Sequence, residues 1–426
     1  MKPMLLAGTT AAVLAAASLA PAMGQATNPV SQVIQWNRTL LVIVRTPGAQ
    51  PATVHPTRSF AIMHAAIYDA VNAIDGTHKP YLVRLSASHF ASQEAAAAAA
   101  AHEVLVKLYP NPNLQAALDA QFQQALAQLP SVGKAEGVSI GNTVADRILA
   151  LRANDGSNAQ PIPYVFGNAP GDYQSTPLNF PKQPQFTHWS RVTPFALEAA
   201  DQFRPGAPPK LTGDRYSDVF DQVKSLGIAG STTATADQAL TGRFWNGAIQ
   251  NYWNEIAQTA SLAHDLTTAE NARLFALLNL SFGDGVIAFY DAKYTYNFWR
   301  PVTAIRAADT DGNPDTEADP NWLPEVGNTT PDPSYPGAHA VISTAGAEVL
   351  ISFFHKDHLE FDVTSEVLAG VVRSFTSFQA AAEEATLSRI FAGVHFLFDL
   401  TTGQRLGSDV ADFVVDNFLT SRDRDD

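Results

Sequence analysis

The sequence lacks cysteine and has few basic residues. None of its 426 residues is cysteine, which excludes disulfide bonds and metal sites built on thiolates. The chain has 27 lysine and arginine residues against 41 aspartate and glutamate residues, a formal net charge of −14, and we find no basic run. Such a chain repels nucleic acids and anionic membrane surfaces, so we expect no nucleic-acid partner.

Long apolar runs are also scarce, and the longest lies at the N-terminus. Lys2 precedes a predominantly apolar run over residues 5–20, which ends in the sequence Ala20-Pro21-Ala22. This pattern is typical of a secretory signal peptide, which we place at residues 1–24, and it predicts export to the periplasm or the extracellular space. No other stretch reaches about 18 uninterrupted apolar residues, so we expect no membrane span in the mature chain.

Apolar residues recur at helical spacing through most of the remaining chain. The segments 57–74 and 91–108 are the clearest examples, the second because it is largely alanine. No clear strand is evident. We therefore predict an all-α fold of two helical bundles, with residues 25–195 in the first and residues 196–426 in the second. Further helices are expected over residues 33–44, 114–128, 138–154, 216–226, 236–260, 268–292, 339–354, 364–384 and 403–419.

A long irregular segment, residues 155–193, separates the helices of the two predicted bundles. It is rich in proline, glycine, asparagine and glutamine. A stretch of this length inside a compact protein is usually functional or wraps a surface. Farther on, the aromatic pairs Phe244-Trp245 and Tyr252-Trp253 could line a substrate pocket, although core packing is the simpler interpretation.

Lys293 and Arg300 form the first of three charged clusters. They are seven residues apart. At roughly 100° per residue, this spacing falls only about 20° short of two helical turns. On one helix both side chains would point to the same side, about 10 Å apart, and could converge on one anion. Pro301 disfavours helical geometry at the residue before it, so we expect a helix to end here.

The second cluster, Pro336-Gly337-Ala338-His339, is typical of a helix start. Proline and glycine are unfavourable inside a helix, whereas the apolar run over residues 340–354 favours one. The free N–H groups of Gly337, Ala338 and His339 would point out of the helix end. Such an end is a ready site for an anion.

The third cluster contains Arg389, His395 and Asp399. His395 and Asp399 are four residues apart, so on a helix they would lie one above the other. Asp399 could then accept the proton of one ring nitrogen and leave the other free as a ligand or nucleophile. Gly393 predicts a bend that brings Arg389 and His395 together. The three clusters thus predict a site for a tetrahedral or trigonal oxoanion.

These clusters resemble the pattern KxxxxxxRP … PSGH … SRxxxxxHxxxD of the superfamily that unites vanadium haloperoxidases and type 2 phosphatidic acid phosphatases. Order and spacing agree in all three clusters. The chain is similar to the long bacterial haloperoxidase-like branch, which implies a vanadium chloroperoxidase-like fold with the oxoanion site in the C-terminal bundle.

The resemblance implies a role for each matched residue. His395 would be the vanadium ligand in a peroxidase, or the phosphorylated nucleophile in a phosphatase. Asp399 would orient His395, and His339 would transfer protons. The residues that would bind the oxygens of vanadate or phosphate are Lys293, Arg300, Gly337, Ala338 and Arg389.

The sequence departs from the superfamily pattern at two places. Gly337 and Ala338 stand where the pattern has Ser-Gly, which removes a hydroxyl donor to the oxoanion. Asp332 lies seven residues before His339, where chloroperoxidases have phenylalanine and bromoperoxidases have histidine. A carboxylate there is expected to repel halide and to raise the pKa of His339.

The resemblance implies a vanadate-dependent haloperoxidase-like enzyme that oxidises halide with hydrogen peroxide. Two alternatives stay open. One is a secreted acid phosphatase that cleaves a phosphate ester through a phosphohistidine in the same site, and the other is a non-catalytic oxoanion-binding homologue. Chain length favours the first reading, because the stand-alone phosphatases of the superfamily are much shorter. A homo-oligomer is compatible with the sequence.

Residues 309–320 are a candidate calcium-binding loop. Their oxygen-bearing side chains follow the alternate spacing of a calcium loop. Pro314 replaces the glycine that such a loop requires, and Pro320 replaces its bidentate glutamate. We therefore expect a solvated acidic loop, with calcium as the minor alternative.

Overall fold

The computed structural model describes residues 30–422. The chain divides into two units after Val30, and every described helix and strand lies in the second, which is compact. The expected signal peptide, residues 1–24, lies outside the described residues.

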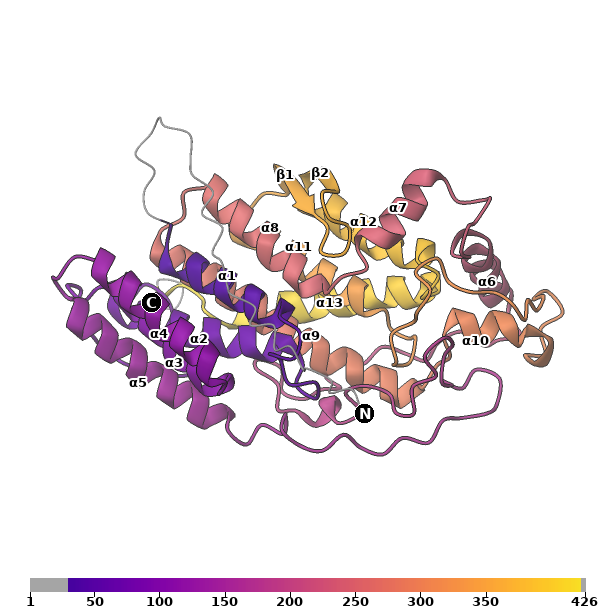
Figure 1. Ribbon diagram of the computed structural model, residues 1–426, viewed down its shortest axis with the longest axis horizontal. Helices are drawn as coiled ribbons and strands as arrows, with labels where there is room; N and C mark the ends of the chain where they lie inside the picture. Colours follow the sequence, from indigo (N-terminus) through magenta and orange to yellow (C-terminus); the bar gives the residue numbers. More distant parts are fainter. Residues whose placement is uncertain (1–29, 423–426) are drawn as a thin grey trace, which may run out of the picture. The chain divides into compact units, whose positions relative to one another are not determined.

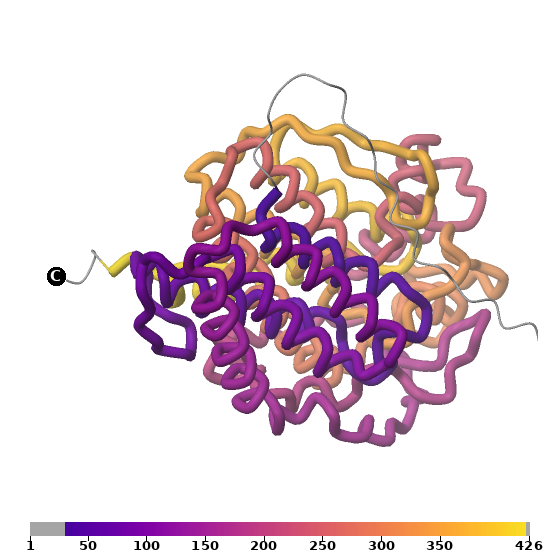
Figure 2. Tube along the Cα trace, turned by 60° about the vertical axis from the view of Figure 1, so that its left-hand side comes forward, coloured from indigo at the N-terminus to yellow at the C-terminus, as the bar shows by residue number. Residues whose placement is uncertain are grey.

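The N-terminal helices of the second unit pack closely because their contact faces carry small residues. Seven consecutive alanines, residues 95–101, are fully buried on α3, which packs against α2 and α5 (Figures 1 and 2). A Cβ atom on Gly137 or Gly141 of α5 would lie 2.4 Å from a backbone oxygen at the facing turns of α3. The helices are α1 (Gln32–Arg45), α2 (Pro56–Asp75), α3 (Gln93–Leu108), α4 (Pro112–Gln128) and α5 (Lys134–Arg152).

The rest of the unit is also mainly helical, which confirms the predicted all-α class. The boundary between two bundles at residues 195 and 196 stays a prediction. The α-helices are α6 (Asp214–Leu226), α7 (Ala236–Phe244), α8 (Ile249–Ala263), α9 (Thr268–Tyr296), α10 (Pro301–Arg306), α11 (Ala338–Phe354), α12 (Phe378–Phe391) and α13 (Leu397–Asn417), with 3-10 turns at Trp189–Arg191 and Ala308–Thr310.

Helix α9 is central to the packing. Thr267 and Glu270 form a capping box at its start. It packs against α2 of the N-terminal helices and against α11 and α13 of the C-terminal helices (Figure 1). By length and composition α9 could cross a membrane, but 94% of its most apolar window is buried inside the fold. Its apolar composition therefore matches its place in the core.

Two expectations about secondary structure were wrong. The helix expected over residues 236–260 is divided into α7 and α8 by a turn at residues 245–248. The helix expected over residues 364–384 begins only at Phe378, because the residues before it form an antiparallel hairpin of β1 (His358–Thr364) and β2 (Val372–Ser377). Alternate residues Phe361, Val363 and Phe375 are buried, which is the period of a half-buried strand.

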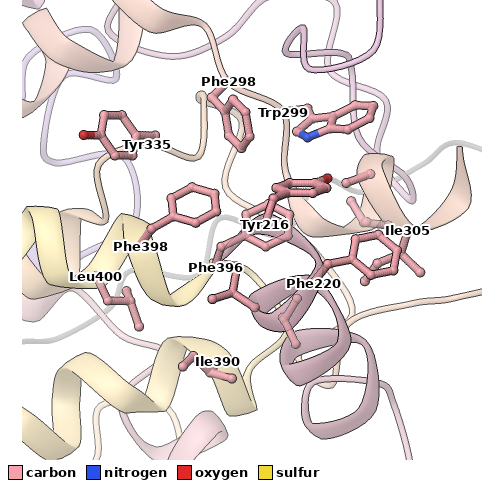
Figure 3. Packing of buried hydrophobic residues seen from close by; sticks show 14 of the residues in the cluster. Tyr216, Phe220, Phe298, Trp299, Ile305, Tyr335, Ile390, Phe396, Phe398 and Leu400 are labelled. Carbon is pink, nitrogen blue, oxygen red and sulfur yellow. The ribbon is translucent and has the colours of Figure 1, made fainter. Parts of the chain in front are cut away.

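An aromatic core cluster lies beside the charged clusters. Figure 3 shows rings contributed by α6, by the segment before α10 and by the start of α13. Trp299 is fully buried and precedes Arg300 in the chain, while Phe396 is fully buried and follows His395. These apolar anchors fix the backbone that carries both functional side chains. The largest members are Tyr216, Phe220, Phe298, Trp299, Trp322, Tyr335, Phe396 and Phe398.

The long irregular segment closes on itself. The N–H of Thr193 donates to the carbonyl oxygen of Asp155 at 2.8 Å, so its two ends lie together. Midway, the N–H of Tyr173 donates to the carbonyl oxygen of Asn297 at the end of α9. Figure 1 shows this segment running along the edge of the helices, which agrees with the expectation that it wraps a surface.

Candidate active site

Lys293 and Arg300 lie close together, although they do not share a helix as the sequence predicted. Helix α9 ends at Tyr296, because Asn297 adopts a left-handed conformation with φ of 48°. Lys293 is in the last turn of α9, and Arg300 is the residue that precedes α10, whose first position is Pro301. Both cationic side chains are buried, Lys293 completely and Arg300 to within 2%.

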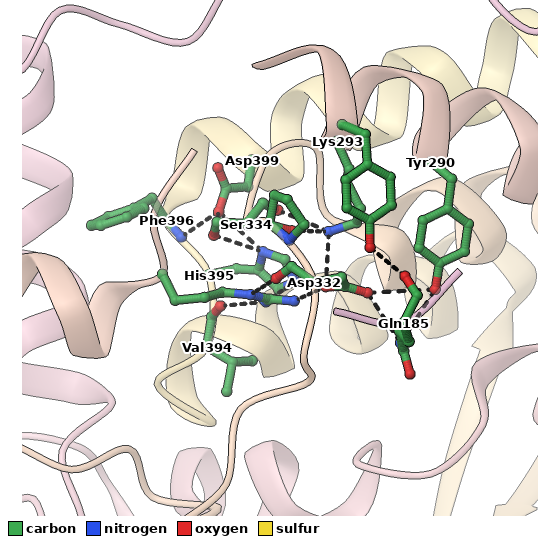
Figure 4. A network of polar contacts seen from close by, with 12 residues as sticks. Gln185, Tyr290, Lys293, Asp332, Ser334, Val394, His395, Phe396 and Asp399 are labelled. Atoms are coloured by element: carbon green, nitrogen blue, oxygen red, sulfur yellow. Dashed lines mark hydrogen bonds and ion pairs between the residues drawn. The ribbon is translucent and has the colours of Figure 1, made fainter. Parts of the chain in front are cut away.

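Asp332 joins these two cations (Figure 4). Its Oδ1 forms ion pairs with Lys293 Nζ, at 3.4 Å, and with Arg300 Nη2. Its backbone oxygen accepts from Arg300 Nε at 2.8 Å. Burial alone would raise the pKa of Asp332, but the charges of Lys293 and Arg300 lower it below its usual value. Burial lowers the pKa of Lys293 to about 8 against the opposing charge of Asp332. The carboxylate is therefore ionised and paired.

The pairing changes what Asp332 does to its neighbours. The sequence predicted that Asp332 would raise the pKa of His339, and this was wrong. Burial first, and then the positive charge of Arg389, lower the pKa of His339 well below its usual value. Asp332 is bonded to two cations and is not among the groups that shift the pKa of His339.

His395 and Asp399 are hydrogen-bonded as predicted, but by a different geometry. His395 lies before α13, not within a helix, and Asp399 lies in the first turn of α13. His395 Nδ1 and Asp399 Oδ2 are 3.0 Å apart, and the same oxygen accepts from the Ser334 hydroxyl at 2.6 Å and the Phe396 N–H at 3.0 Å. Burial raises the pKa of Asp399 to about 6, and the Ser334 and Phe396 donors oppose that rise.

These contacts fix the tautomer of His395. Burial and the nearby charges of Arg300 and Lys293 lower the pKa of His395 well below its usual value, so the ring is neutral at pH 7. The Asp399 carboxylate accepts a hydrogen bond from His395 Nδ1, which places the ring proton on Nδ1. Nε2 then carries the lone pair, which accepts a hydrogen bond from Arg300 Nη1 at 3.1 Å. This nitrogen is therefore the one available as a ligand or nucleophile.

Arg389 has unpaired donors, which distinguishes it from the other two cations. It lies in the last turn of α12 and is 3% exposed. Nη2 donates to Asn246 Oδ1 at 3.0 Å, whereas Nε and Nη1 are buried without a hydrogen-bond partner. Burial and the charge of Arg300 lower the pKa of Arg389 to about 9. A buried guanidinium with unpaired N–H groups is unfavourable unless an anion accepts from it.

The bend between Arg389 and His395 is present at the expected residue. Gly393 has φ of 77°, a conformation that favours glycine, and a Cβ atom there would lie 2.2 Å from the carbonyl oxygen of Gly227. The N–H of Val394 returns to the carbonyl oxygen of Arg389 at 3.1 Å. This turn carries the chain from α12 to His395.

Gly337, Ala338 and His339 form the start of α11 as predicted, with one difference. The N–H of Gly337 is not free, because it donates to the carbonyl oxygen of Asp399 at 2.9 Å. No side chain caps this end of α11. His339 Nε2 lies 2.9 Å from the carbonyl oxygen of Trp245. Since a carbonyl only accepts, Nε2 carries the proton and Nδ1 is the unprotonated nitrogen.

Several contributors to this site were missed from the sequence. Asn246 and the carbonyl of Trp245 come from the turn between α7 and α8, where the sequence pattern shows only an aromatic pair. Gln185 comes from the long irregular segment, and its Nε2 donates to Asp332 Oδ2 at 3.2 Å. Ser334 is part of the second cluster, but no signal in the sequence indicated its bond to Asp399. Their partners are distant in sequence, so spacing could not reveal them.

The acidic loop at residues 309–320 is more ordered than expected. Asp311 and Asn313 are buried, and both Asp311 carboxylate oxygens accept hydrogen bonds, from the Asn313 N–H and the Thr316 hydroxyl. Among residues 30–422, no group of three or more histidine, cysteine, aspartate or glutamate side chains is arranged to hold a metal ion. Asn313 Nδ2 also donates to the carbonyl oxygen of Leu211 at 2.7 Å, which fastens the loop to the segment before α6.

Comparison with known proteins agrees with this arrangement. A model of the VCPO second helical-bundle domain matches residues 273–423, which include all three charged clusters. Vanadium chloroperoxidase from Curvularia inaequalis is 25% identical over 485 aligned positions, which cover 86% of this chain and 78% of that protein. Together, the matched second domain and this relative support placing the chain in the vanadium haloperoxidase superfamily.

Solved structures of vanadium haloperoxidases share the fold. A bacterial vanadium-dependent iodoperoxidase superposes with a TM-score of 0.78 at 23% identity, covering 94% of this chain and all of that one. A bacterial vanadium-dependent chloroperoxidase in its apo form has a TM-score of 0.67 at 15% identity, covering 87% of this chain and 93% of that one. The likeness of fold therefore extends over the N-terminal helices as well as the C-terminal ones.

Proposed function

We propose that this protein is a vanadate-dependent peroxidase that oxidises halide with hydrogen peroxide. The observation that carries the proposal is the pair of unpaired donors on buried Arg389, next to two further buried cations and a neutral histidine. Such a donor set fits a tetrahedral oxoanion. The similarity to chloroperoxidase and iodoperoxidase over both halves of the chain supports vanadate as that oxoanion.

The chain's own residues would divide the binding task. Arg389 would donate Nε–H and Nη1–H to oxoanion oxygens, because these are its unpaired donors. Lys293 and Arg300 would add positive charge, held in place by Asp332. His395 would bind the vanadium through Nε2. Bound vanadate would act as a Lewis acid that activates hydrogen peroxide for attack by halide.

Asp399 would act through His395. Its Oδ2 holds the Nδ1 proton of the imidazole, which keeps the Nε2 lone pair directed toward the cations. Ser334 and the Phe396 N–H in turn fix that carboxylate oxygen. This chain of contacts orients the ligand nitrogen.

His339 would move protons. Its pKa is lowered well below the usual value, so it is neutral at pH 7 and can accept a proton. The Trp245 carbonyl holds the Nε2 proton, which makes Nδ1 the accepting atom. We propose that Nδ1 takes the proton that hydrogen peroxide loses on binding and later returns it to the departing oxygen.

The proposal is tested by adding orthovanadate to purified, phosphate-free protein. Oxidation of bromide and of iodide by hydrogen peroxide is measured before and after the addition, and hydrolysis of p-nitrophenyl phosphate is followed in parallel. We expect halide oxidation that depends on vanadate. Hydrolysis without vanadate-dependent oxidation would instead support the phosphatase alternative. Vanadate binding with neither activity would indicate a non-catalytic oxoanion-binding protein.

Arg389→Ala provides the matching binding test. Charge-assisted hydrogen bonds in buried sites contribute about 1.5–3 kcal/mol each, so we expect vanadate affinity to fall at least about tenfold. The exposed Arg147 offers a control, and Arg147→Ala should leave vanadate affinity unchanged. Equal affinity in the Arg389→Ala and Arg147→Ala variants would contradict the assignment.

A further inference from the structure

We propose that Asp332 makes this buried site select tetrahedral oxoanions with a single negative charge over those with two. The inference rests on the proposed function, because it concerns the same site. It assigns Asp332 as a specificity-determining residue, a task that differs from the repulsion of halide expected from the sequence.

Asp332 is a fixed part of the site. It is 3% exposed, and both of its carboxylate oxygens are occupied. Oδ1 pairs with Lys293 and Arg300, while Oδ2 lies 3.2 Å from Gln185 Nε2 and 3.5 Å from the Tyr290 hydroxyl (Figure 4). Four partners from three separate segments hold the side chain, so an incoming anion does not simply displace it.

The carboxylates leave one net positive charge in the site. The buried cations are Lys293, Arg300 and Arg389, and the buried carboxylates are Asp332 and Asp399. Arg300 Nη1 only donates and lies 3.1 Å from His395 Nε2, so this nitrogen is unprotonated and the His395 ring is neutral. Burial at the start of α11 lowers the pKa of His339 well below its usual value. A monoanion therefore makes the cluster neutral, whereas a dianion leaves a net negative charge away from water.

The positions of the unpaired donors also favour an oxoanion with a single negative charge. Arg389 offers two free N–H groups, whereas Lys293 and Arg300 already share the Asp332 carboxylate. An oxoanion bound between them would lie near one uncompensated cation and near the Asp332 charge. At an effective dielectric constant of about 20 and a separation of about 6 Å, one added unit of ligand charge changes the interaction with Asp332 by roughly 100-fold in affinity.

Molybdate and perrhenate provide the test, because both are tetrahedral oxoanions of similar size. Molybdate carries two negative charges, whereas perrhenate carries one. Each is titrated calorimetrically into wild-type protein and into Asp332→Asn near neutral pH. We expect molybdate affinity to gain roughly 100-fold more than perrhenate affinity when the Asp332 charge is removed. Gains of the same factor for the two anions, or no gain, would overturn the proposal.

Two further variants separate the effect of the Asp332 charge from a general effect of substitution on the fold. Asp155 is equally buried and paired with two arginines, Arg58 and Arg152, so Asp155→Asn removes a comparable ion-paired carboxylate outside the site. It should leave the ratio of the two affinities unchanged. Asp332→Glu, which keeps the charge, should retain the wild-type ratio, and a shifted ratio in either variant counts against the proposal.

A measurement on the wild-type protein alone covers the case in which Asp332→Asn does not fold. Orthovanadate is titrated near pH 7, where its monoanion predominates in solution, in two buffers of different ionisation enthalpy. We expect binding without net proton exchange, and release of about one proton per vanadate, which would mark a bound dianion, would overturn the proposal. If wild-type protein binds molybdate, perrhenate and orthovanadate without the expected preference, only the selectivity proposal fails. If it binds none of the three, the proposed function fails as well.

Discussion

His395 and His339 have different hydrogen-bond partners, and the difference predicts different effects of their removal. His395 is held by Asp399 and faces the cations, whereas His339, at the start of α11, is held by the backbone carbonyl of Trp245. We expect His395→Ala to abolish tight vanadate binding. His339→Ala should keep most binding and lose turnover by about 10²–10⁴-fold, the usual contribution of a general acid–base group.

Vanadate titration and bromide oxidation, measured on both variants, check this division. Loss of binding in His339→Ala with retained binding in His395→Ala would mean that the roles are reversed.

At the scale of single residues, the sequence predicted which residue types form the site better than it predicted how they are arranged. Spacing alone indicated Lys293 and Arg300, and the structure brings them together through Asp332, a partner found only by folding. The unpaired donors of Arg389 also depend on what packs around it, which a single sequence does not reveal. Gln185 is 147 residues from the carboxylate that it contacts. Contacts of such range follow from tertiary structure, not from local pattern.

At the scale of elements, Asp284 ties residues 195–197, the segment that directly follows the long irregular stretch, to α9. Its carboxylate accepts from the consecutive N–H groups of Phe195, Ala196 and Leu197 at 2.6–2.8 Å. Asp284→Asn replaces one acceptor oxygen by a donor, so we expect the free energy of unfolding to fall by about 1–3 kcal/mol.

Urea unfolding of Asp284→Asn measures this effect, with Asp218→Asn as the control because Asp218 is exposed on α6. A free energy of unfolding equal to that of the control would show that the segment is held by other contacts.

The errors in the predicted helices and strands have physical causes. Periodicity predicted most helices, since their buried faces recur at helical spacing. It missed the hairpin of β1 and β2, whose short strands bury only alternate residues such as Phe361 and Phe375. It also missed the turn between α7 and α8, because the aromatic residues there are buried in either arrangement. That turn supplies contacts to Arg389 and His339, so the missed break matters for the site.

For the whole molecule, buried His64 predicts loss of stability in acid. It is fully buried on α2, its Nε2 lies 2.9 Å from Asn37 Oδ1, and burial lowers its pKa from 6.5 to about 3. Between these values the unfolded chain binds a proton that the folded chain does not. The folded state therefore loses up to about 1.4 kcal/mol for each pH unit below 6.5 from this group.

The contribution is isolated by comparing wild type with His64→Gln, which can still donate to Asn37. We expect the free energy of unfolding to decline less steeply in the variant between about pH 6.5 and pH 4.5. Parallel declines would show that His64 does not contribute to the acid sensitivity.

The most direct measurement of the central claim is a crystal structure of the protein soaked in orthovanadate, with vanadium located by anomalous scattering. We expect one strong peak beside His395 Nε2, with the Nε and Nη1 donors of Arg389 on the oxoanion and the Arg300–His395 contact replaced. A peak only in the separate cavity of about 510 Å³ lined by Arg215 and Arg405, or no peak at all, would contradict the account.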